Sequence, residues 1–433
     1  MSSFVKDLVR VGTSNVAVIL FGVATSIVTA RFIGPEGNGI IAGLTVYPAL
    51  FMSFGSLGIR QSTAYFLGKN IYSEDRIKRA ITQIWSLTTV VSLVICYLLM
   101  IYFSKSGENF LLVILALLPI PFSLFVTYNS GIFLGRNDIK SFNKVNWIPP
   151  FIVLVVSLVL VGLFEQGVKG ALIAALGGQV FMAILMLLKN EFIKAFSLIY
   201  DFKVIKSMLS LGIVYAIALL IINLNYKVDV ILLDKLSTSY ELGIYSKGAG
   251  IIQYLWQIPM VLSTIIFSRS ASAKDDYVFS LKVAQLLRIS LIIVGGASLV
   301  LFFMSNFVIL AMYGEAFRAS VSVLKILLPG VLLLTVFKVM NMDLAGKGKP
   351  WVSMKAMIPA LILNVILNLL WIQDYGANGA SLASSVSYSV AAILFAYFYC
   401  KETKVPAKEL FYIRKSDFNI IFSKMGKFIP IKK

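Results

Sequence analysis

The residues of this 433-residue chain that could do chemistry are charged and amide side chains inside long apolar segments. One polar stretch holds Asn223, Asn225, Lys227 and Asp229 between apolar neighbours. Asn223 and Lys227 are four apart and share a helix face, as do Asn225 and Asp229, whereas Lys227 and Asp229 point in roughly opposite directions. We therefore expect one face to present a cation to a cavity while the other braces the helix bundle. The alternative is a brace throughout.

Other cations also lie within the apolar segments. They are Arg60, Lys247, Arg288, Lys325 and Lys338, with Arg31 at the outer end of the first segment. Such groups are costly in lipid, so they face a bundle interior or a wet cavity, unless they reach the headgroups by snorkelling. Asp229 is the single embedded acid that we count against them. The imbalance predicts a cavity that attracts an anion, and a lipid-linked phosphate or diphosphate is the obvious membrane anion with a large polar body.

The candidate substrate ligands are the cavity cations Lys227, Arg31, Arg60 and Lys247. Asp229, Asn223 and Asn225 are candidates for ion coupling or for bracing. Asn364 and Asn368 form a second pair four residues apart, for which interhelical hydrogen bonds are the simpler interpretation.

Several kinds of site are missing from the sequence. There is no histidine, which removes the usual general base and the commonest metal ligand. There is no P-loop motif and no acid cluster suited to a divalent metal. We therefore expect a protein that is not an enzyme, with no metal and no cofactor.

The elements that carry these residues are predicted to be membrane helices. The chain is 59% hydrophobic and 14% charged, and its apolar residues form blocks of about 20 residues, the length that crosses the hydrocarbon core as a helix. We predict an all-α membrane protein with twelve such helices, at about 11–33, 39–66, 81–103, 110–134, 147–164, 168–188, 207–234, 242–267, 284–309, 321–344, 351–372 and 377–400. Very short loops predict two hairpins, 147–188 and 351–400.

The net charge of +19 does not indicate nucleic-acid binding, because of where the cations lie. Alternate loops together with the C-terminal tail hold 28 of the 39 Lys and Arg residues, and the other loops hold 5. The positive-inside rule then places both termini in the cytoplasm.

The chain also repeats itself. Pro48, Pro119 and Pro149 recur as Pro259, Pro329 and Pro359 at offsets of 211, 210 and 210 residues. Such a duplication predicts two homologous six-helix lobes around a central cavity, typical of transporters. The predicted divisions are an N-terminal lobe at 1–188, an interfacial amphipathic linker at 189–206, a C-terminal lobe at 207–400 and a basic cytoplasmic tail at 401–433. The tail is expected to lie on the membrane or to form a loose basic segment.

Four motifs occur in an order that resembles one family. They are Thr29-Ala30-Arg31-Phe32-Ile33-Gly34-Pro35-Glu36-Gly37-Asn38-Gly39, Tyr226-Lys227-Val228-Asp229, Leu242-Gly243-Ile244-Tyr245-Ser246 and Asn378-Gly379-Ala380-Ser381-Leu382-Ala383. With twelve helices, the chain resembles the polysaccharide-transporter (Wzx-like) flippases of O-antigen type, within the multidrug/oligosaccharidyl-lipid/polysaccharide exporter superfamily.

The resemblance implies a flippase that moves an undecaprenyl-diphosphate-linked oligosaccharide from the cytoplasmic to the outer leaflet by alternating access. It implies a bacterial plasma (inner) membrane, assembly of O-antigen lipopolysaccharide, capsule or exopolysaccharide, and a polymerase and chain-length regulator as partners besides the membrane lipids. It also implies coupling to a proton or sodium gradient. Two alternatives stay open: a multidrug exporter of the same superfamily, and a non-transporting membrane scaffold or polymerase of polysaccharide assembly.

Overall fold

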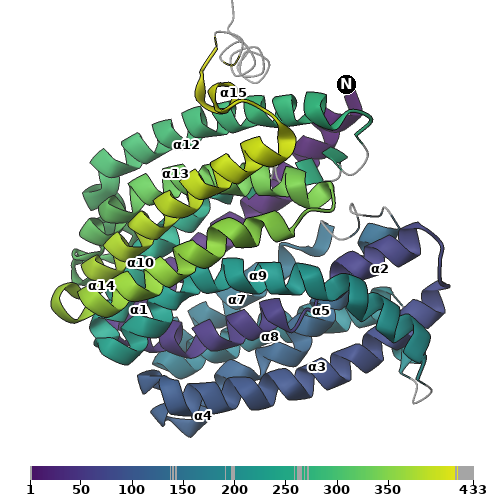
Figure 1. Cartoon of the computed structure of the whole chain (residues 1–433). Helices are drawn as coiled ribbons and strands as arrows, with labels where there is room; N and C mark the ends of the chain where they lie inside the picture. Colours follow the sequence, from purple (N-terminus) through teal and green to yellow (C-terminus); the bar gives the residue numbers. More distant parts are fainter. Residues whose placement is uncertain are drawn as a thin grey trace, which may run out of the picture. The chain divides into compact units, whose positions relative to one another are not determined.

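Long apolar helices make up the computed structural model of the chain (Figure 1). The structure describes residues 2–433 except 137, 139, 140, 142, 143, 191, 197–199, 258, 261–265, 268, 271, 272, 415, 416 and 418–433. The elements are α1 Ser2–Phe54, α2 Ile59–Gly68, α3 Glu74–Phe103, η1 Lys105–Glu108, α4 Phe110–Leu117, α5 Pro119–Gly135, α7 Ile148–Ser157, η2 Leu158–Leu163, α8 Gly167–Lys189, η3 Phe192–Ala195, α9 Phe202–Leu236, α10 Ser239–Leu255, α12 Asp276–Tyr313, η4 Glu315–Phe317, α13 Ser320–Gly346, α14 Trp351–Thr403 and α15 Ala407–Phe411.

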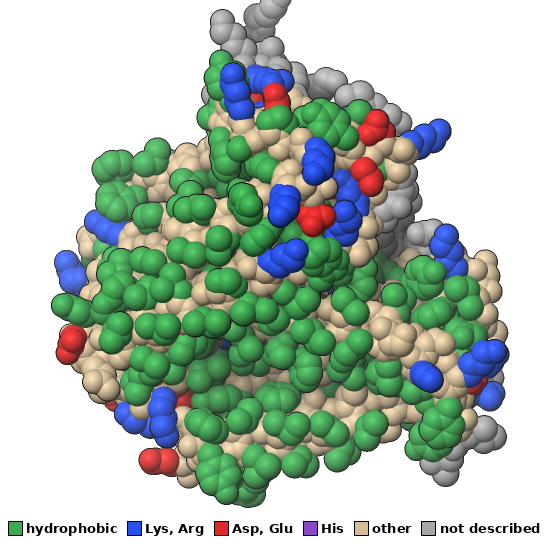
Figure 2. All heavy atoms as spheres, viewed as in Figure 1, with side chains coloured by type: hydrophobic (Ala, Val, Ile, Leu, Met, Phe, Trp, Pro, Cys, Tyr) green, Lys and Arg blue, Asp and Glu red, His purple; other side chains and the backbone are tan. Residues whose placement is uncertain are grey.

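Eight helical stretches in the described part of the chain are long and apolar enough to cross a membrane. Their outward side chains are apolar as well: Leu87 is 66% exposed and Phe303 is 80% exposed. Figure 2 shows hydrophobic side chains along the flanks of the helices and most charged side chains near helix ends. Surfaces of this kind are stable against hydrocarbon and unfavourable in water, so the chain is a multi-pass membrane protein.

The first long helix, α1, bends at Gly34, which has φ 73° and is followed by Pro35. Proline cannot donate a backbone hydrogen bond, so the bend leaves carbonyls without their helical partners. The buried amide of Asn38 supplies donors at the bend, because its Nδ2 lies 2.6 Å from the Gly34 oxygen and 2.9 Å from the Thr29 oxygen. The bend falls between the predicted helices 11–33 and 39–66.

The helix α14 changes direction at Gly376, which has φ 51°. The segments before and after this residue lie side by side and run in opposite directions. The Ser387 hydroxyl donates to the Ala360 carbonyl oxygen at 2.9 Å, and Lys349 Nζ lies 3.0 Å from a Glu402 oxygen. The sequence separation grows from the first pair to the second, which is the pattern of an antiparallel pair. The predicted hairpin at 351–400 is therefore confirmed.

Two other predicted helices are not continuous α-helices. The predicted helix 110–134 is broken into α4 and α5 just before Pro119. The predicted helix 147–164 begins as α7, with its prolines in the first turn, and ends as a π-helical segment, η2. Within 189–206, the described residues contain the short 3-10 helix η3, and Phe192 there is fully buried against Phe125.

The chain is organised as two compact units. The first contains residues 1–247, 309–320 and 368–380. In it α1 packs against α9, α2 against α5 and α9, and α7 against α8 (Figure 1). A glycine makes one of these approaches possible, because a Cβ on Gly58 would overlap the backbone of Gly212 in α9. Small residues at such crossings let helix backbones come close, and this packing drives association where lipid replaces water.

The second unit contains residues 248–308, 321–367 and 381–433. Its helices α13 and α14 pack through the rings of Phe337 and Phe395, whose centroids are 4.8 Å apart. Gly330 of α13 approaches Ser385 of α14, and the Ser385 hydroxyl accepts the Gly330 N–H at 3.0 Å. The C-terminal segment is tied to α12 by Arg288, which is bidentate to the buried Asp417. Phe418 and the later residues of the predicted interfacial tail lie outside the described residues.

Candidate functional site

The polar stretch predicted at 223–229 lies in the C-terminal half of α9, and its two faces differ in burial. Asn225 and Asp229 are both fully buried, whereas Asn223 and Lys227 keep part of their surface exposed. The four-residue spacing therefore separates one packed face from one partly accessible face, as expected. Lys227 forms no hydrogen bond or ion pair with any residue that the structure describes. It is a cation with remaining capacity to donate, inside a helix long enough to span the membrane.

The Asp229 carboxylate accepts hydrogen bonds from side chains of other helices. Tyr245 of α10 donates its hydroxyl proton to Oδ2 at 2.8 Å, and Asn368 of α14 donates from Nδ2 to Oδ1 at 3.0 Å. Asn368 thus makes an interhelical hydrogen bond, and its role beyond this contact stays a prediction. Neutral donors hold this buried carboxylate in place, and they join α9, α10 and α14 at one point.

The other predicted amides are also placed in the packing. Asn223 donates from Nδ2 to the Ser53 hydroxyl at 2.8 Å and to the Leu219 carbonyl at 2.7 Å, so it joins α9 to α1. Asn364 lies fully buried in α14. These contacts agree with bracing by Asn223, and the choice between bracing and ion coupling stays a prediction.

Lys247 of α10 is buried against α1 by neutral oxygens. Its Nζ lies 2.9 Å from the Thr29 hydroxyl, 3.1 Å from the Ser26 carbonyl and 3.3 Å from the Ser26 hydroxyl. The ring of Tyr313 lies 5.4 Å from the same nitrogen, a distance suited to a cation–π contact. No Asp or Glu among the described residues forms an ion pair with it. Its positive charge is therefore solvated by dipoles and not neutralised.

Arg60 lies in the first turn of α2, two residues after Gly58. Its Nε is buried and has no hydrogen-bond partner among the residues that the structure describes. A buried guanidinium donor without a partner is unusual, because leaving it unpaired costs about 1–3 kcal/mol. Arg60 therefore also has capacity to bind an anion.

Arg31 lies in a different environment from the other three cations. Its Nε donates to the Met312 carbonyl at 3.1 Å and its Nη2 to the Ala311 carbonyl at 2.6 Å. These carbonyls belong to the last turn of α12, whose helical pattern ends at Gly314 with φ 88°. A cation at a helix C-terminus satisfies orphan carbonyls and the negative end of the dipole. This contact gives Arg31 a structural role, and binding of substrate by Arg31 stays a prediction.

Two further cations predicted to lie in helices contact aromatic rings. Lys338 Nζ lies 4.0 Å from the centroid of Trp256, and Lys325 Nζ lies 5.1 Å from that of Phe302. The prediction of a single embedded acid is wrong. Asp234 in α9 and Asp343 in α13 are buried as well, at 4% and 0% exposure. Both lie in the last turns of long helices, where the sequence alone places a charge in the headgroup region.

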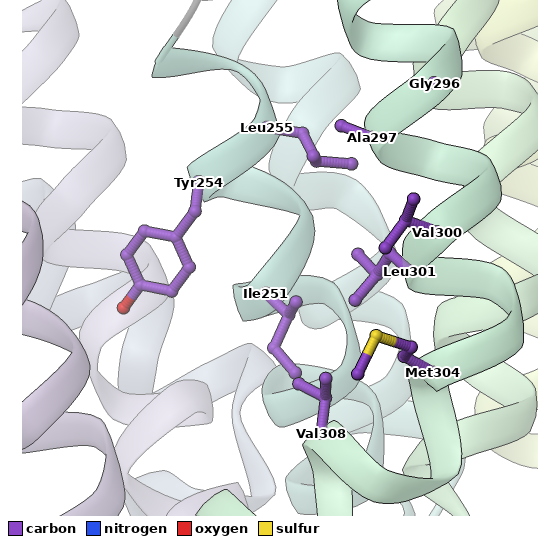
Figure 3. Close-up of a pocket in the computed structure, with 9 residues that line it drawn as sticks. All are labelled: Ile251, Tyr254, Leu255, Gly296, Ala297, Val300, Leu301, Met304 and Val308. Atoms are coloured by element: carbon purple, nitrogen blue, oxygen red, sulfur yellow. The ribbon is translucent and has the colours of Figure 1, made fainter. Parts of the chain in front are cut away.

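One described cavity has a different chemistry. It measures about 460 Å³ and lies between α10 and α12 in the second unit (Figure 3). Its lining is apolar apart from the hydroxyl of Tyr254. The lining residues are Ile251, Tyr254, Leu255, Gly296, Ala297, Val300, Leu301, Met304 and Val308. It contains none of the predicted site residues and no charge, so it suits hydrocarbon and not a phosphate or a sugar.

A family model described as "Polysaccharide biosynthesis protein" matches residues 28–322, which is more than half of the chain. The chain belongs to the polysaccharide biosynthesis protein family. The matched region includes Arg31, Arg60, Lys227, Asp229 and Lys247, while Asn364 and Asn368 lie beyond it.

Two archaeal proteins are similar to this chain at low sequence identity. "Uncharacterized membrane protein MJ1375" of Methanocaldococcus jannaschii is 24% identical over 411 residues, covering 92% of this chain and 97% of its own. "Probable low-salt glycan biosynthesis flippase Agl15" of Haloferax volcanii is 22% identical over 173 residues, covering 39% of this chain and 37% of its own. These relatives do not support the expected bacterial inner membrane.

Solved structures of transporters show the fold of this family member. The lipid II flippase MurJ in an inward closed conformation matches with a TM-score of 0.77 at 14% identity, covering 96% of this chain and 92% of its own. An inward-facing multidrug resistance MATE transporter matches with a TM-score of 0.72 at 14% identity, covering 89% and 94%. A transporter of the same superfamily from Pyrococcus furiosus Vc1 matches with a TM-score of 0.66 at 13% identity, covering 92% and 94%. The fold is therefore the two-lobed MurJ- and MATE-like transporter fold.

Sequence reasoning missed the partners that complete these sites. Ser26, Tyr313 and the hydroxyl of Tyr245 carry no signal in a spacing argument, because each belongs to another helix than the charge it contacts. Tyr245 and Thr29 do stand inside the quoted motifs. The motif glycines have a structural reason too, since a Cβ on Gly39 would overlap the Ser239 carbonyl and one on Gly243 the Pro35 carbonyl.

Proposed function

We propose that this protein flips a polyprenyl-diphosphate-linked oligosaccharide from the cytoplasmic to the outer leaflet, for assembly of a cell-surface polysaccharide. The observation that carries the proposal is Lys227, a partly exposed cation without a hydrogen bond or ion pair among the described residues. It lies in mid-helix in a chain of the polysaccharide biosynthesis family with a transporter fold. The name of the Haloferax volcanii relative, a probable glycan biosynthesis flippase, agrees with it.

The proposed mechanism assigns the diphosphate to the cations that are not neutralised by acids. Lys227 donates charge-assisted hydrogen bonds to the phosphate oxygens, and the Arg60 guanidinium presents its unused Nε donor. Lys247 adds a third positive charge held by Ser26 and Thr29. The oligosaccharide occupies a wet cavity, while the prenyl chain stays in hydrocarbon, so the transfer of the prenyl chain costs little free energy.

In this proposal the chain crosses the membrane twelve times with both termini in the cytoplasm. The bends at Gly34 and Gly376 then mark outer turns, each between two crossings. A proton or sodium gradient drives the cycle, and Asp229 is the candidate coupling residue. Both relatives named above are archaeal, so the membrane is proposed as the plasma membrane of a prokaryotic cell, archaeal or bacterial.

The proposal is tested by replacing Lys227 in cells that depend on this protein for their surface glycan. Lys227→Ala should export roughly 30-fold less glycan, since losing a charged hydrogen bond costs about 2 kcal/mol. The lipid-linked precursor should accumulate while the level of folded protein in the membrane is unchanged. Lys235→Ala is the matched control, because Lys235 lies exposed at the end of the same helix and donates to the Tyr102 carbonyl.

Normal export by folded Lys227→Ala protein would overturn this site. A multidrug exporter is the alternative, because the MATE transporters share the fold. Loss of resistance to cationic drugs on deletion of the gene, with unchanged surface glycan, would replace the flippase proposal.

A further inference from the structure

Asp234 forms a polar cluster separate from the site described above. It lies in the last turn of α9, where its carboxylate is only 4% exposed. The Ser104 hydroxyl donates to Oδ2 at 2.5 Å, and the Ser106 hydroxyl donates to Oδ1 at 2.7 Å. These serines come from the segment that joins α3 to α4, so two distant parts of the chain meet at one carboxylate.

No cation neutralises this carboxylate. Among the described residues, Asp234 forms no ion pair, whereas the buried Asp343 has Lys347 Nζ at 3.1 Å. The lysines nearest in sequence to this cluster, Lys105 and Lys235, are exposed and donate to the backbone carbonyls of Ser237 and Tyr102. A buried charge without a partner of opposite sign is unfavourable, so a bound cation would stabilise this arrangement.

A third hydroxyl group lies near the same carboxylate. Tyr47 of α1 is 3% exposed, and its hydroxyl has no hydrogen-bond partner among the described residues. It is close enough to the Asp234 carboxylate to interact with its charge. Gly43, one turn earlier on the same face of α1, lies so close to Asp234 that a Cβ there would overlap Oδ1. The Tyr47 oxygen is thus an unused polar atom on the face of α1 that approaches the cluster.

A cavity lies beside the cluster. A cavity of about 280 Å³ is lined by Ser104 and by neighbouring residues that include Tyr97, Gly107 and Glu108. Glu108 is exposed and contributes a negative charge at this cavity. The predicted topology places the segment between α3 and α4 on the outer side of the membrane, so the cavity would admit ions from outside.

We propose that Asp234, Ser104, Ser106 and Tyr47 form a binding site for a monovalent metal cation, with Na⁺ as the ion. Every donor in the cluster is an oxygen, the ligand that hard cations prefer. A single carboxylate balances one positive charge, whereas a divalent ion would bring an uncompensated charge into a buried site. The serine hydroxyls rotate on binding, so that they offer lone pairs to the ion in place of protons to the carboxylate.

The role of this ion rests on the proposed transport function. A sodium gradient directed into the cell would drive export if Na⁺ enters the site from the outer side. The binding itself does not depend on the glycan. It is measured as saturable binding of radioactive ²²Na⁺ to the purified full-length protein, with choline chloride as the ionic-strength control. The measurement is made in the Asp229→Asn background, so that a cation held at Asp229 does not contribute.

The Asp229→Asn protein should bind Na⁺ saturably, and the added change Asp234→Asn should abolish that binding. Adding Tyr47→Phe or Ser106→Ala should weaken the affinity about tenfold, since each removes one oxygen ligand and keeps the charge. Glu315→Gln is the control, an exposed acid paired with Arg318, and it should leave binding unchanged.

Persistence of Na⁺ binding in the folded Asp229→Asn, Asp234→Asn protein would overturn the site, as would its absence in Asp229→Asn alone. If Asp234→Asn prevents folding, the Tyr47→Phe and Ser106→Ala affinities decide, and unchanged values would overturn the site. Failure here leaves the Lys227 experiment unaffected, because export there is measured with the Asp234 cluster intact.

Discussion

The Tyr245 hydroxyl donates a hydrogen bond of 2.8 Å to the Asp229 carboxylate. Both residues belong to the sequence motifs on which the resemblance to the flippase family rests. Asn368 completes the contact from α14. The most polar point of α9 is therefore a junction of three helices. Its two faces have different roles: the Asp229 face is packed and hydrogen-bonded, whereas Lys227 is left with its donors unused.

We expect Asp229→Asn to lower the stability of the purified protein by about 1–3 kcal/mol, because an amide replaces one of two oxygens that accept buried hydrogen bonds. The measurement is the thermal unfolding midpoint. Tyr245→Phe removes one donor and should have a smaller effect. Transport in proteoliposomes separates the two candidate roles: a coupling residue affects only transport driven by a gradient, whereas a brace affects transport with and without one. Unchanged stability and transport would contradict both.

We expect Arg60→Ala and Lys247→Ala each to lower glycan export about tenfold or more at normal protein levels, because each removes one positive charge that no acid neutralises. Arg60→Lys should be milder if charge alone matters, since lysine keeps the charge and loses the planar fork. Thr29→Val is the control for Lys247, because it removes a hydroxyl partner and leaves the ammonium group. Full export by the double alanine variant would exclude both residues as substrate ligands.

The glycine in the α10 motif is predicted to be required for packing and not for chemistry. A Cβ on Gly243 would overlap the Pro35 carbonyl, so Gly243→Ala should destabilise the protein by about 1–3 kcal/mol or prevent folding. Gly250→Ala in the same helix is the matched control, since a Cβ on Gly250 would meet no other atom within 4 Å. Size-exclusion profiles and unfolding midpoints compare the two. Equal behaviour of both variants would show that the close approach at Pro35 is relaxed.

The predicted topology is tested with reporters. A reporter fused after Lys408 should be cytoplasmic, and one inserted near Asn378 should be on the outer side, because Gly376 turns the chain between two crossings. Cysteine labelling by a membrane-impermeant reagent provides the same comparison without a fusion. The reverse pattern would refute the twelve-helix count and, with it, the pairing of the two halves.

The length of the apolar segments and the spacing of polar residues predicted the helices and the residues that share a helix face. They did not predict the hydrogen-bond partners on other helices. Apolar blocks of spanning length located α8 and α13 closely, and the loops expected at 34–38 and 373–376 coincide with the bends at Gly34 and Gly376. The period of a helix tells which residues share a face, whereas the neighbour of that face depends on tertiary packing. Asp229 and Asn368 are 139 residues apart in sequence, so no local pattern joins them. Asp234 was missed because a charge near a helix end resembles an ordinary headgroup contact.

The buried ion pair between Arg288 and Asp417 fastens the C-terminal segment to α12. Arg288 Nε lies 2.8 Å from Oδ2, and Nη2 lies 3.1 Å from Oδ1. Burial alone would raise the pKa of Asp417, but hydrogen bonds from Arg288, the Arg414 backbone N–H and Gln285 outweigh it and lower that pKa below its usual value. A carboxyl with a lowered pKa stabilises the folded state at neutral pH, and this stabilisation is lost as the pH falls below about 4.

Asp417→Asn should therefore release α15 at pH 7, because removing one partner leaves the other charge buried and unpaired. Hydrogen exchange of residues 407–411, followed by mass spectrometry, should show faster exchange in this variant than in the unmodified protein. Glu409→Gln is the control: it alters only the exposed pair with Arg414, and the Glu409 backbone carbonyl that accepts from Arg288 Nη1 remains. Equal protection in Asp417→Asn and the unmodified protein would mean that apolar contacts, such as those of the buried Leu410, hold the segment without the ion pair.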